Sequence, residues 1–340
     1  MTRILLTGGS GFLAAHILEL LLKEGHSVVT TVRSQSKADK IKETFPSYTK
    51  EHLDFAIVED VAKPDAFDSV VVSNPPFEAV IHTASPFHFA ATNIQKELLD
   101  PAVVGTTSIL KAVKASAPAV KRVVITSSFA ALANVAKGDW PEHTYTEEDW
   151  NPMTVEEALA NVYMGYAGSK AFAEKAAWDF IKTESPSFSL ATINPTLIFG
   201  PIFPKLHSLS SLNTSNALTY AITQGAAKEK IPDMGGHCWV DVRDVALAHV
   251  RAIDAAGAEN QRFFLTANEN FNNRTVVDII RKNFPEYQSS LPSESVEGGN
   301  YPPGGIYKTD NSKSTRVLGI KYHDLETAIV DTVKSFKAAS

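Results

Sequence analysis

The chain has 340 residues, of which 44% are hydrophobic and 21% are charged, and its formal net charge at pH 7 is −6. This length and composition fit a folded globular protein with one large or two smaller domains, and they exclude a disordered or fibrous chain. The mild acidic excess provides no long-range attraction to nucleic acid or to anionic lipid, so we expect neither as a partner.

The cysteine content and the N-terminus indicate the compartment. The chain has a single cysteine, Cys238, which can form neither an internal disulfide nor a zinc site with other cysteines. The apolar part of the N-terminus is too short for a signal peptide, and no apolar run approaches the roughly 20 residues that span a bilayer. We therefore expect a cytoplasmic protein that does not contact a membrane.

Short apolar runs alternate with helical patterns through the first half of the chain. The runs lack polar alternation, which is typical of strands covered on both faces. The expected strands are Ile4–Leu6, Val28–Val32, Phe55–Val58, Ala79–Thr83, Val123–Thr126 and Leu190–Ile193. The expected helices are residues 14–22, Asp100–Ala115 and Tyr166–Lys182. This alternation predicts an α/β fold with a Rossmann-type doubly wound parallel sheet.

The second half of the chain differs from the first in composition. The Ser/Asn-rich run His207–Asn216 and the Pro/Gly-rich stretch Tyr287–Gly305 indicate loops, and a helix is expected near Ala217–Lys228. We expect residues 1–194 to form a nucleotide-binding Rossmann domain to which residues 238–252 return. Residues 195–340 would form mainly a smaller, irregular α+β region that binds the substrate.

A glycine-rich segment, Thr7-Gly8-Gly9-Ser10-Gly11-Phe12-Leu13-Ala14, joins the first strand to the first helix. Glycines there allow a tight turn that approaches a pyrophosphate closely, and the helix N-terminus offers unpaired N–H donors. A glycine turn alone is weak evidence, but its position between a first strand and a first helix strengthens it. The sequence therefore predicts a dinucleotide site.

The residues after the second strand indicate which dinucleotide is bound. An NAD site places an acid about 20 residues beyond the glycine turn, to hold the ribose 2′-hydroxyl. This segment instead contains Arg33 and Lys37, with no acid before Asp39. The two cations suit a 2′-phosphate, so we expect NADPH/NADP+. The alternative is that both are solvated surface residues.

Tyr166 and Lys170 lie four residues apart, on one face of a predicted helix. A cation near a phenol favours the phenolate and lowers the pKa of the phenol, which suits a proton donor to a carbonyl oxygen. Such a pair also arises by chance on protein surfaces. It is evidence for a catalytic site only in combination with the glycine turn.

The adjacent Ser127 and Ser128 follow the fifth expected strand, at the sheet edge where ligands bind in open α/β folds. One of these hydroxyls could hydrogen-bond a substrate oxygen and stabilise its developing negative charge. The alternative is that both satisfy backbone groups at the end of the strand.

Together, the glycine turn, Ser128 and the Tyr166/Lys170 pair resemble the extended short-chain dehydrogenase/reductase family. The likeness covers nearly the whole chain. Further matching segments are His82-Thr83-Ala84-Ser85-Pro86, Asn194-Pro195 and Val240–Ala246. Within the family, the chain is most similar to fungal NADPH-dependent carbonyl reductases of the methylglyoxal reductase type, which are related to plant dihydroflavonol reductases. Residues 33–35, 126–131 and 173–178 carry that closer likeness.

The resemblance implies a role for each matching position. Ser128 would orient the carbonyl, Tyr166 would donate the proton, and Lys170 would lower the Tyr166 pKa and hold the nicotinamide ribose. The cofactor-binding positions would be Gly8, Gly9, Ser10, Gly11, Phe12 and Leu13 at the pyrophosphate, Arg33 and Lys37 at the 2′-phosphate, Asp60 and Val61 at the adenine, Thr83, Ala84 and Ser85 at the ribose and linking phosphates, Pro195 and Ile198 at the nicotinamide, and Ser215 at a phosphate.

The substrate pocket is less closely specified. The candidates for an apolar wall beside the nicotinamide are Phe87, Phe129, Tyr163 and Met164. Aromatic residues near strand ends are about as often simple core, which is the alternative here. A second charged cluster, Asp241/Arg243/Asp244, is interpreted as a structural ion pair and helix cap. The histidines lack metal-site spacing, and the expected chemistry needs no metal.

These observations predict an NADPH-dependent carbonyl reductase, also termed a ketoreductase, acting reversibly on small-molecule aldehydes and ketones as a monomer or homodimer. One alternative is an NAD-dependent sugar-nucleotide epimerase or dehydratase on the same fold. The other is a catalytically silent NADP-sensing regulator. The first would be expected to carry an acid after the second strand, and the second tends to lose the tyrosine–lysine pair.

Overall fold

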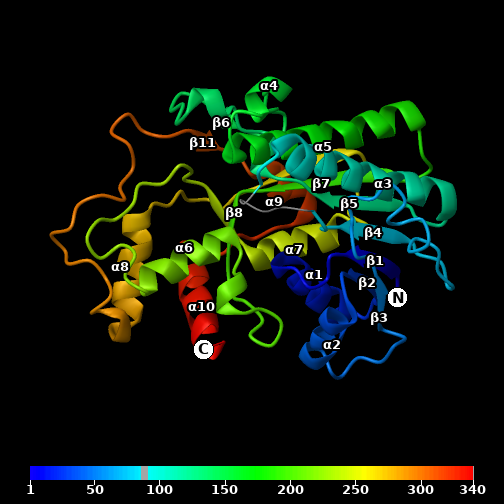
Figure 1. Ribbon diagram of the computed structural model, residues 1–340, viewed down its shortest axis with the longest axis horizontal. Helices are drawn as coiled ribbons and strands as arrows, with labels where there is room; N and C mark the ends of the chain where they lie inside the picture. Colours follow the sequence, from blue (N-terminus) through cyan, green and yellow to red (C-terminus); the bar gives the residue numbers. More distant parts are fainter. Residues whose placement is uncertain (86–90, 340) are drawn as a thin grey trace.

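The structure is a computed structural model that describes residues 1–85 and 91–339. Its centre is a seven-stranded sheet, built from described residues, in which every neighbouring pair is parallel (Figure 1). The strand order is β10-β7-β5-β4-β1-β2-β3. The strands are β1 (Arg3–Thr7), β2 (Ser27–Val32), β3 (Leu53–Ile57), β4 (Ala79–His82), β5 (Arg122–Thr126), β7 (Ser189–Pro195) and β10 (Gln261–Leu265). The predicted doubly wound sheet is confirmed.

Helices cover both faces of this sheet, because its strands present apolar side chains on each side. Along β1, Ile4 and Leu6 face one core with α1 (Phe12–Lys23) and α7 (Val242–Arg251). Leu5 faces the opposite core, with α3 (Asp100–Ser116) and α5 (Val162–Glu184). Figure 1 shows these two helical layers above and below the sheet.

The chain starts at β1 in the middle of the sheet, runs outward to β3, and returns to place β4 on the other side of β1. Sheets of this kind bind ligands beside the carboxyl ends of the strands where the winding direction reverses. The glycine turn follows β1, and Thr83–Ser85 follow β4. Both segments therefore meet at the reversal point.

The second half of the chain builds a smaller layer beside the sheet. Its elements are β8 (Leu197–Phe199), α6 (Thr214–Thr223), β9 (Trp239–Asp241), α8 (Asn273–Asn283), α9 (Ser312–Leu318) and α10 (Leu325–Ala338). Strands β8 and β9 pair in parallel, and a separate core around Phe199, Trp239 and Phe271 holds this layer together. The remaining elements are α2 (Gln35–Thr44), α4 (Val155–Ala158), the paired β6 (Thr144–Tyr145) and β11 (Lys308–Thr309), and single helical turns at Gln95–Leu99, Phe129–Ala131, Val135–Lys137, Leu209–Ser211 and Pro285–Tyr287.

Some elements differ from the sequence-based expectation. Strand β10 was not predicted, because its polar first residues leave only Phe263–Leu265 as an apolar run. Helix α6 begins inside the run expected to be a loop and ends at Thr223, just before Gly225 with its positive φ of 96°. Helix α5 starts at Val162 rather than Tyr166, because Asn161 accepts a capping hydrogen bond from the Met164 N–H.

Two glycines near the start of α5, Gly165 and Gly168, have a packing role. A Cβ at Gly165 would lie 2.5 Å from the Ile94 side chain, and one at Gly168 would lie 2.5 Å from Ala158. The glycines therefore allow neighbouring segments to pack closely onto the helix. Among the described residues, none of the helices has the length and apolarity to cross a bilayer.

Candidate active site

The glycine turn combines two different uses of glycine. Gly8 adopts φ +79°, and a Cβ there would lie 3.2 Å from backbone atoms of Ala84. Gly9 is a packing residue, since its Cβ would lie 2.0 Å from Thr30 Oγ1 on β2. Gly11 precedes α1 and has no side chain to cap it, so the first-turn N–H groups stay available for an anion.

A cavity of about 270 Å³ lies between this turn, the end of β2 and the segment after β4. Its lining residues are Gly8, Ser10, Gly11, Thr31, Val32, Arg33, Lys37, Val58, Val61, Thr83, Ala84 and Ser85. The cavity combines glycine backbone, a helix N-terminus and two cations, which together fit the phosphates of a dinucleotide. Half of the predicted cofactor positions are thus brought together here.

Other predicted cofactor positions do not line this cavity. The Asp60 side chain is exposed and accepts a hydrogen bond from the Ala62 N–H at 2.9 Å. Phe12 lines a neighbouring cavity, and Leu13 follows it on α1. The remaining positions belong to the second half of the chain and are Pro195 at the end of β7, Ile198 on β8 and Ser215 in the first turn of α6.

Three cavity residues were missed by the sequence analysis: Thr31, Val32 and Val58. Thr31 Oγ1 also accepts a hydrogen bond from the Gly8 N–H at 3.0 Å, which ties the glycine turn to β2. All three lie at or just beyond the carboxyl ends of strands. That position was the signal that could have identified them.

Helix α5 places Tyr166 and Lys170 beside the reversal point of the sheet. Lys170 Nζ donates a hydrogen bond to Ser85 Oγ at 3.1 Å and lies 5.8 Å from the centroid of the Tyr166 ring. Burial lowers the pKa of Lys170 to about 8. The lysine therefore links the predicted catalytic helix to the cofactor cavity.

The pKa of Tyr166 differs from the expectation that Lys170 would lower it. Burial disfavours the phenolate and raises the pKa of Tyr166, while its hydrogen bond with Ser128 acts in the opposite direction. The Lys170 ammonium is directed to Ser85 instead. In this structure Tyr166 is a protonated phenol at neutral pH.

The two adjacent serines have separate tasks. The buried Ser127 donates a hydrogen bond from its Oγ to Glu174 Oε2 at 2.5 Å. The half-buried Ser128 caps the turn Phe129–Ala131, because its Oγ accepts a hydrogen bond from the Ala130 N–H at 3.1 Å. The Ser128 side chain is also hydrogen-bonded to the Tyr166 side chain. Ser128 is thus the serine placed with the tyrosine.

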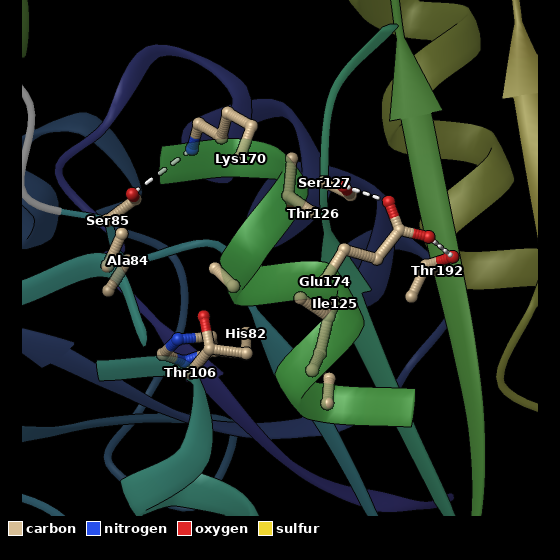
Figure 2. Close-up of a pocket in the computed structure, with 13 residues that line it drawn as sticks. His82, Ala84, Ser85, Thr106, Ile125, Thr126, Ser127, Lys170, Glu174 and Thr192 are labelled. Atoms are coloured by element: carbon tan, nitrogen blue, oxygen red, sulfur yellow. Dashed lines mark hydrogen bonds between the residues drawn. The ribbon is translucent and has the colours of Figure 1, made fainter. Parts of the chain in front are cut away.

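Glu174, one helical turn beyond Lys170, is a site residue that sequence reasoning missed. Figure 2 shows its carboxylate between Ser127 and Thr192, with Lys170 and Ser85 on the other side of a cavity of about 20 Å³. The carboxylate also accepts hydrogen bonds from Asn194 Nδ2 at 2.6 Å and from Arg262 Nε at 2.7 Å. Asn194 in turn donates to the Ser128 carbonyl oxygen at 3.3 Å. A lone carboxylate among alanines at helical spacing from Lys170 was the available signal.

The three predicted substrate-pocket residues that the structure describes are not brought into one wall. Phe129 stacks on Phe264 with ring centroids 5.2 Å apart, inside an aromatic cluster, which is the alternative interpretation for this residue. Met164 packs against the small core around Met153. Tyr163 is 58% exposed at the start of α5. Phe87 lies outside the described residues.

The acidic and basic cluster at the start of α7 is structural, as predicted. Asp241 caps the helix by accepting from the Arg243 N–H at 2.8 Å, and the Arg243 guanidinium pairs with Asp241 and Asp331. Asp244 pairs with His323 at 2.7 Å. Across the part of the chain that the structure describes, no group of three or more His, Cys, Asp or Glu side chains could hold a metal ion.

The fold and this site define a dinucleotide-binding enzyme class, and comparison with known proteins identifies the family. The profile of the NAD dependent epimerase/dehydratase family matches residues 4–265, and the chain belongs to that family. It is 40% identical to the putative NADPH-dependent methylglyoxal reductase GRP2 of Candida albicans, over 98% of this chain and 97% of the relative. It is 42% identical to the ketoreductase azaE of Aspergillus niger over the same shares of both chains.

A solved structure agrees with these relatives. The crystal structure of yeast methylglyoxal/isovaleraldehyde reductase Gre2 complexed with NADPH matches with a TM-score of 0.91 and 37% identity, over 99% of this chain and 98% of that chain. The predicted resemblance to extended short-chain dehydrogenase/reductases, and to fungal reductases of the methylglyoxal reductase type within them, is therefore confirmed.

Proposed function

We propose that the chain is an NADPH-dependent carbonyl reductase that converts small aldehydes and ketones to alcohols, reversibly. The observation that carries the proposal is the Ser128–Tyr166 hydroxyl pair, joined through Lys170 and Ser85 to a cavity that fits a dinucleotide. The relatives named as NADPH-dependent reductases and as a ketoreductase support it.

When bound, NADPH supplies the hydride that adds to the carbonyl carbon. The carbonyl electron pair then moves onto the oxygen, which takes the proton of the Tyr166 hydroxyl. Ser128 orients this oxygen and stabilises its growing negative charge. A raised pKa keeps Tyr166 protonated before the reaction, as a proton donor requires.

Lys170 acts after the proton has left. With a pKa of about 8 it is mainly a cation at pH 7, and it lies near the Tyr166 ring, where a positive charge stabilises the phenolate. Its hydrogen bond to Ser85 keeps the ammonium at the edge of the cofactor cavity. In the reverse direction the same phenolate would accept the proton of an alcohol.

The choice of cofactor rests on Arg33 and Lys37. Both side chains are exposed and line the cavity at the end of β2, where a 2′-phosphate would lie. A charge-assisted hydrogen bond contributes about 1.5–3 kcal/mol, which is roughly one to two decades of affinity. NADPH is therefore the proposed cofactor in preference to NADH.

The proposed substrates are α-dicarbonyls, keto esters or simple aldehydes, and we propose that the protein works in the cytoplasm as a monomer or homodimer. Residues 1–194, with 238–252, serve mainly the cofactor, and residues 195–340 mainly the substrate. Packing of α7 on α1 supports this division. Strand β10 is an exception to it, because this strand lies after residue 194 in the chain and extends the main sheet.

The test uses the purified full chain with NADPH or NADH and a panel of an aldehyde, a β-keto ester and a diketone. Loss of the reduced-cofactor absorbance is expected with at least one carbonyl, and faster with NADPH than with NADH. Absence of oxidation with every carbonyl would contradict the proposal. Conversion of a UDP-sugar by the same preparation would instead support the epimerase alternative that the family name includes.

A further inference from the structure

The two oxygens of the buried Glu174 carboxylate have different partners. Its Oε1 accepts hydrogen bonds from Thr192 Oγ1 at 3.0 Å, from Trp178 Nε1 at 3.2 Å and from Arg262 Nε at 2.7 Å. These donors belong to β7, to α5 itself and to β10. Through Oε1 the carboxylate therefore anchors α5 to two strands of the main sheet.

The Arg262 guanidinium is itself held in place. Its Nη1 donates to the carbonyl oxygens of Glu147 and Asp149 at 2.6 and 2.7 Å, and its Cζ lies 3.6 Å from the centroid of the Trp150 ring. A guanidinium carries only donors, so the atom of the Glu174 side chain that faces Arg262 Nε has to be an acceptor. This contact fixes which end of the carboxylate points toward Arg262.

The other oxygen, Oε2, faces the catalytic serine. It accepts hydrogen bonds from Ser127 Oγ at 2.5 Å and from Asn194 Nδ2 at 2.6 Å. The same Asn194 amide donates to the Ser128 carbonyl oxygen at 3.3 Å. Asn194 therefore connects the Glu174 carboxylate to the backbone of Ser128.

The position of Ser128 depends on this connection, because the chain leaves the sheet at this residue. The Ser127 N–H donates to the Ile193 carbonyl oxygen at 2.7 Å, which continues the pairing of β5 with β7 by one residue. Ser128 lies beyond this bond and begins the turn Phe129–Ala131. Its backbone is tied to β7 by the Asn194 side chain.

Glu174 also shares a helix with the proton donor. Tyr166 and Glu174 lie eight residues apart on α5, which is about 12 Å along the helix axis. The carboxylate thus holds Ser128 against the same helix that presents the Tyr166 hydroxyl. A displacement of about 1 Å in a group that acts on the reacting atoms can lower a rate by about 10²-fold.

We propose that Glu174 is a positioning residue, which holds Ser128 through Asn194 at hydrogen-bond distance from the Tyr166 hydroxyl. This inference rests on the proposed function, because it concerns the step in which Ser128 and Tyr166 act on a carbonyl oxygen. It goes further by assigning part of the reaction rate to a buried carboxylate that acts through another residue.

The first test is Glu174→Gln in the full chain, which keeps the side-chain volume and replaces one oxygen by an NH2 group. Because Arg262 Nε needs an acceptor, the new amide nitrogen turns toward Asn194, where two NH2 groups then oppose each other. We expect kcat with NADPH and an aldehyde to fall by about 10–100-fold. The Kd of NADPH, measured by fluorescence, should stay within about two-fold of the wild type, because the substitution does not alter the cofactor cavity.

A double-mutant cycle with Ser128→Ala shows whether Glu174 acts through Ser128. If it does, Glu174→Gln should lower kcat by less than about two-fold in the Ser128→Ala background, since there is no longer a hydroxyl to position. The same fold-loss in both backgrounds would overturn the inference, because Glu174 would then act independently of Ser128.

Two further variants separate positioning from general loosening of the fold. Trp178→Phe removes a donor to Oε1 and leaves the contacts of Oε2 intact, so its kcat should equal that of the wild type. Asn194→Ala removes the connection to Ser128 while the pair of Glu174 with Arg262 remains, and it should lower kcat about as much as Glu174→Gln. Asn194→Ala therefore keeps the inference testable if Glu174→Gln does not fold.

The opposite results have a clear meaning. Wild-type kcat in Glu174→Gln or in Asn194→Ala, or an equal loss of kcat in Trp178→Phe, would mean that the carboxylate only stabilises the fold. Failure of the proposed function would be seen in the wild type, which would then oxidise NADPH with no carbonyl. Failure of this inference alone would be seen only in the variants.

Discussion

The two ends of the site are built in different ways. At the catalytic end, the buried Ser127, just after β5, is hydrogen-bonded to the buried Glu174, whose carboxylate also accepts hydrogen bonds from β7 and β10. At the phosphate end, Arg33 and Lys37 are exposed side chains after β2 and on α2. Proton transfer requires fixed geometry, whereas attraction of a phosphate requires mainly charge. The difference suggests that the chain fixes its chemistry rigidly and holds its cofactor reversibly.

The strongest test of the catalytic end is Tyr166→Phe. Removal of the proton donor should lower kcat by about 10²–10⁴-fold, because the carbonyl oxygen then receives no proton as it gains charge. The Kd of NADPH, measured by fluorescence, should change little, since the ring remains in place. Turnover close to that of the wild type would show that another group donates the proton.

Glu174→Ala tests the rigidity of the same end. The substitution leaves the buried Arg262 guanidinium without its carboxylate, and loss of one partner of a buried ion pair costs about 3–5 kcal/mol. The free energy of unfolding, measured by urea denaturation, should fall by that order. Glu184→Ala, near the exposed end of the same helix, is the control and should have little effect. Equal stabilities of the two variants would mean that the network does not hold the site together.

The two adjacent serines of the catalytic end, Ser127 and Ser128, are expected to differ in what their substitution changes. Ser128→Ala should lower kcat by about 10²–10³-fold, the usual effect of removing one donor to a developing oxyanion. Ser127→Ala should instead mainly reduce stability, by about 1–3 kcal/mol, because it leaves a Glu174 oxygen with one donor fewer. Steady-state kinetics and thermal unfolding of both variants check this. A larger loss of kcat in Ser127→Ala would reverse the two assignments.

The parts of the molecule that were predictable from sequence depend on local patterns. The glycine turn, Arg33, and the Tyr166/Lys170 spacing each occupy a few neighbouring residues, so the sheet and the main cavity could be anticipated. Glu174 could not, because its partners lie far away in the chain, as Arg262 does. Strand β10 was missed for the same reason, since its pairing with β7 compensates for a short apolar run.

The smallest expected effect is at the phosphate end. Arg33→Ala should weaken NADPH binding by about 10–100-fold and NADH binding much less, because only NADPH carries the 2′-phosphate. Lys37→Ala should act in the same direction, since both cations line the same cavity. Exposed charges are screened by salt, so the loss in each variant should shrink as ionic strength rises toward 1 M. Fluorescence titrations at several salt concentrations check both points. A loss that is equal for the two cofactors and insensitive to salt would mean that Arg33 shapes the cavity by packing, and that the two ends of the site are built alike.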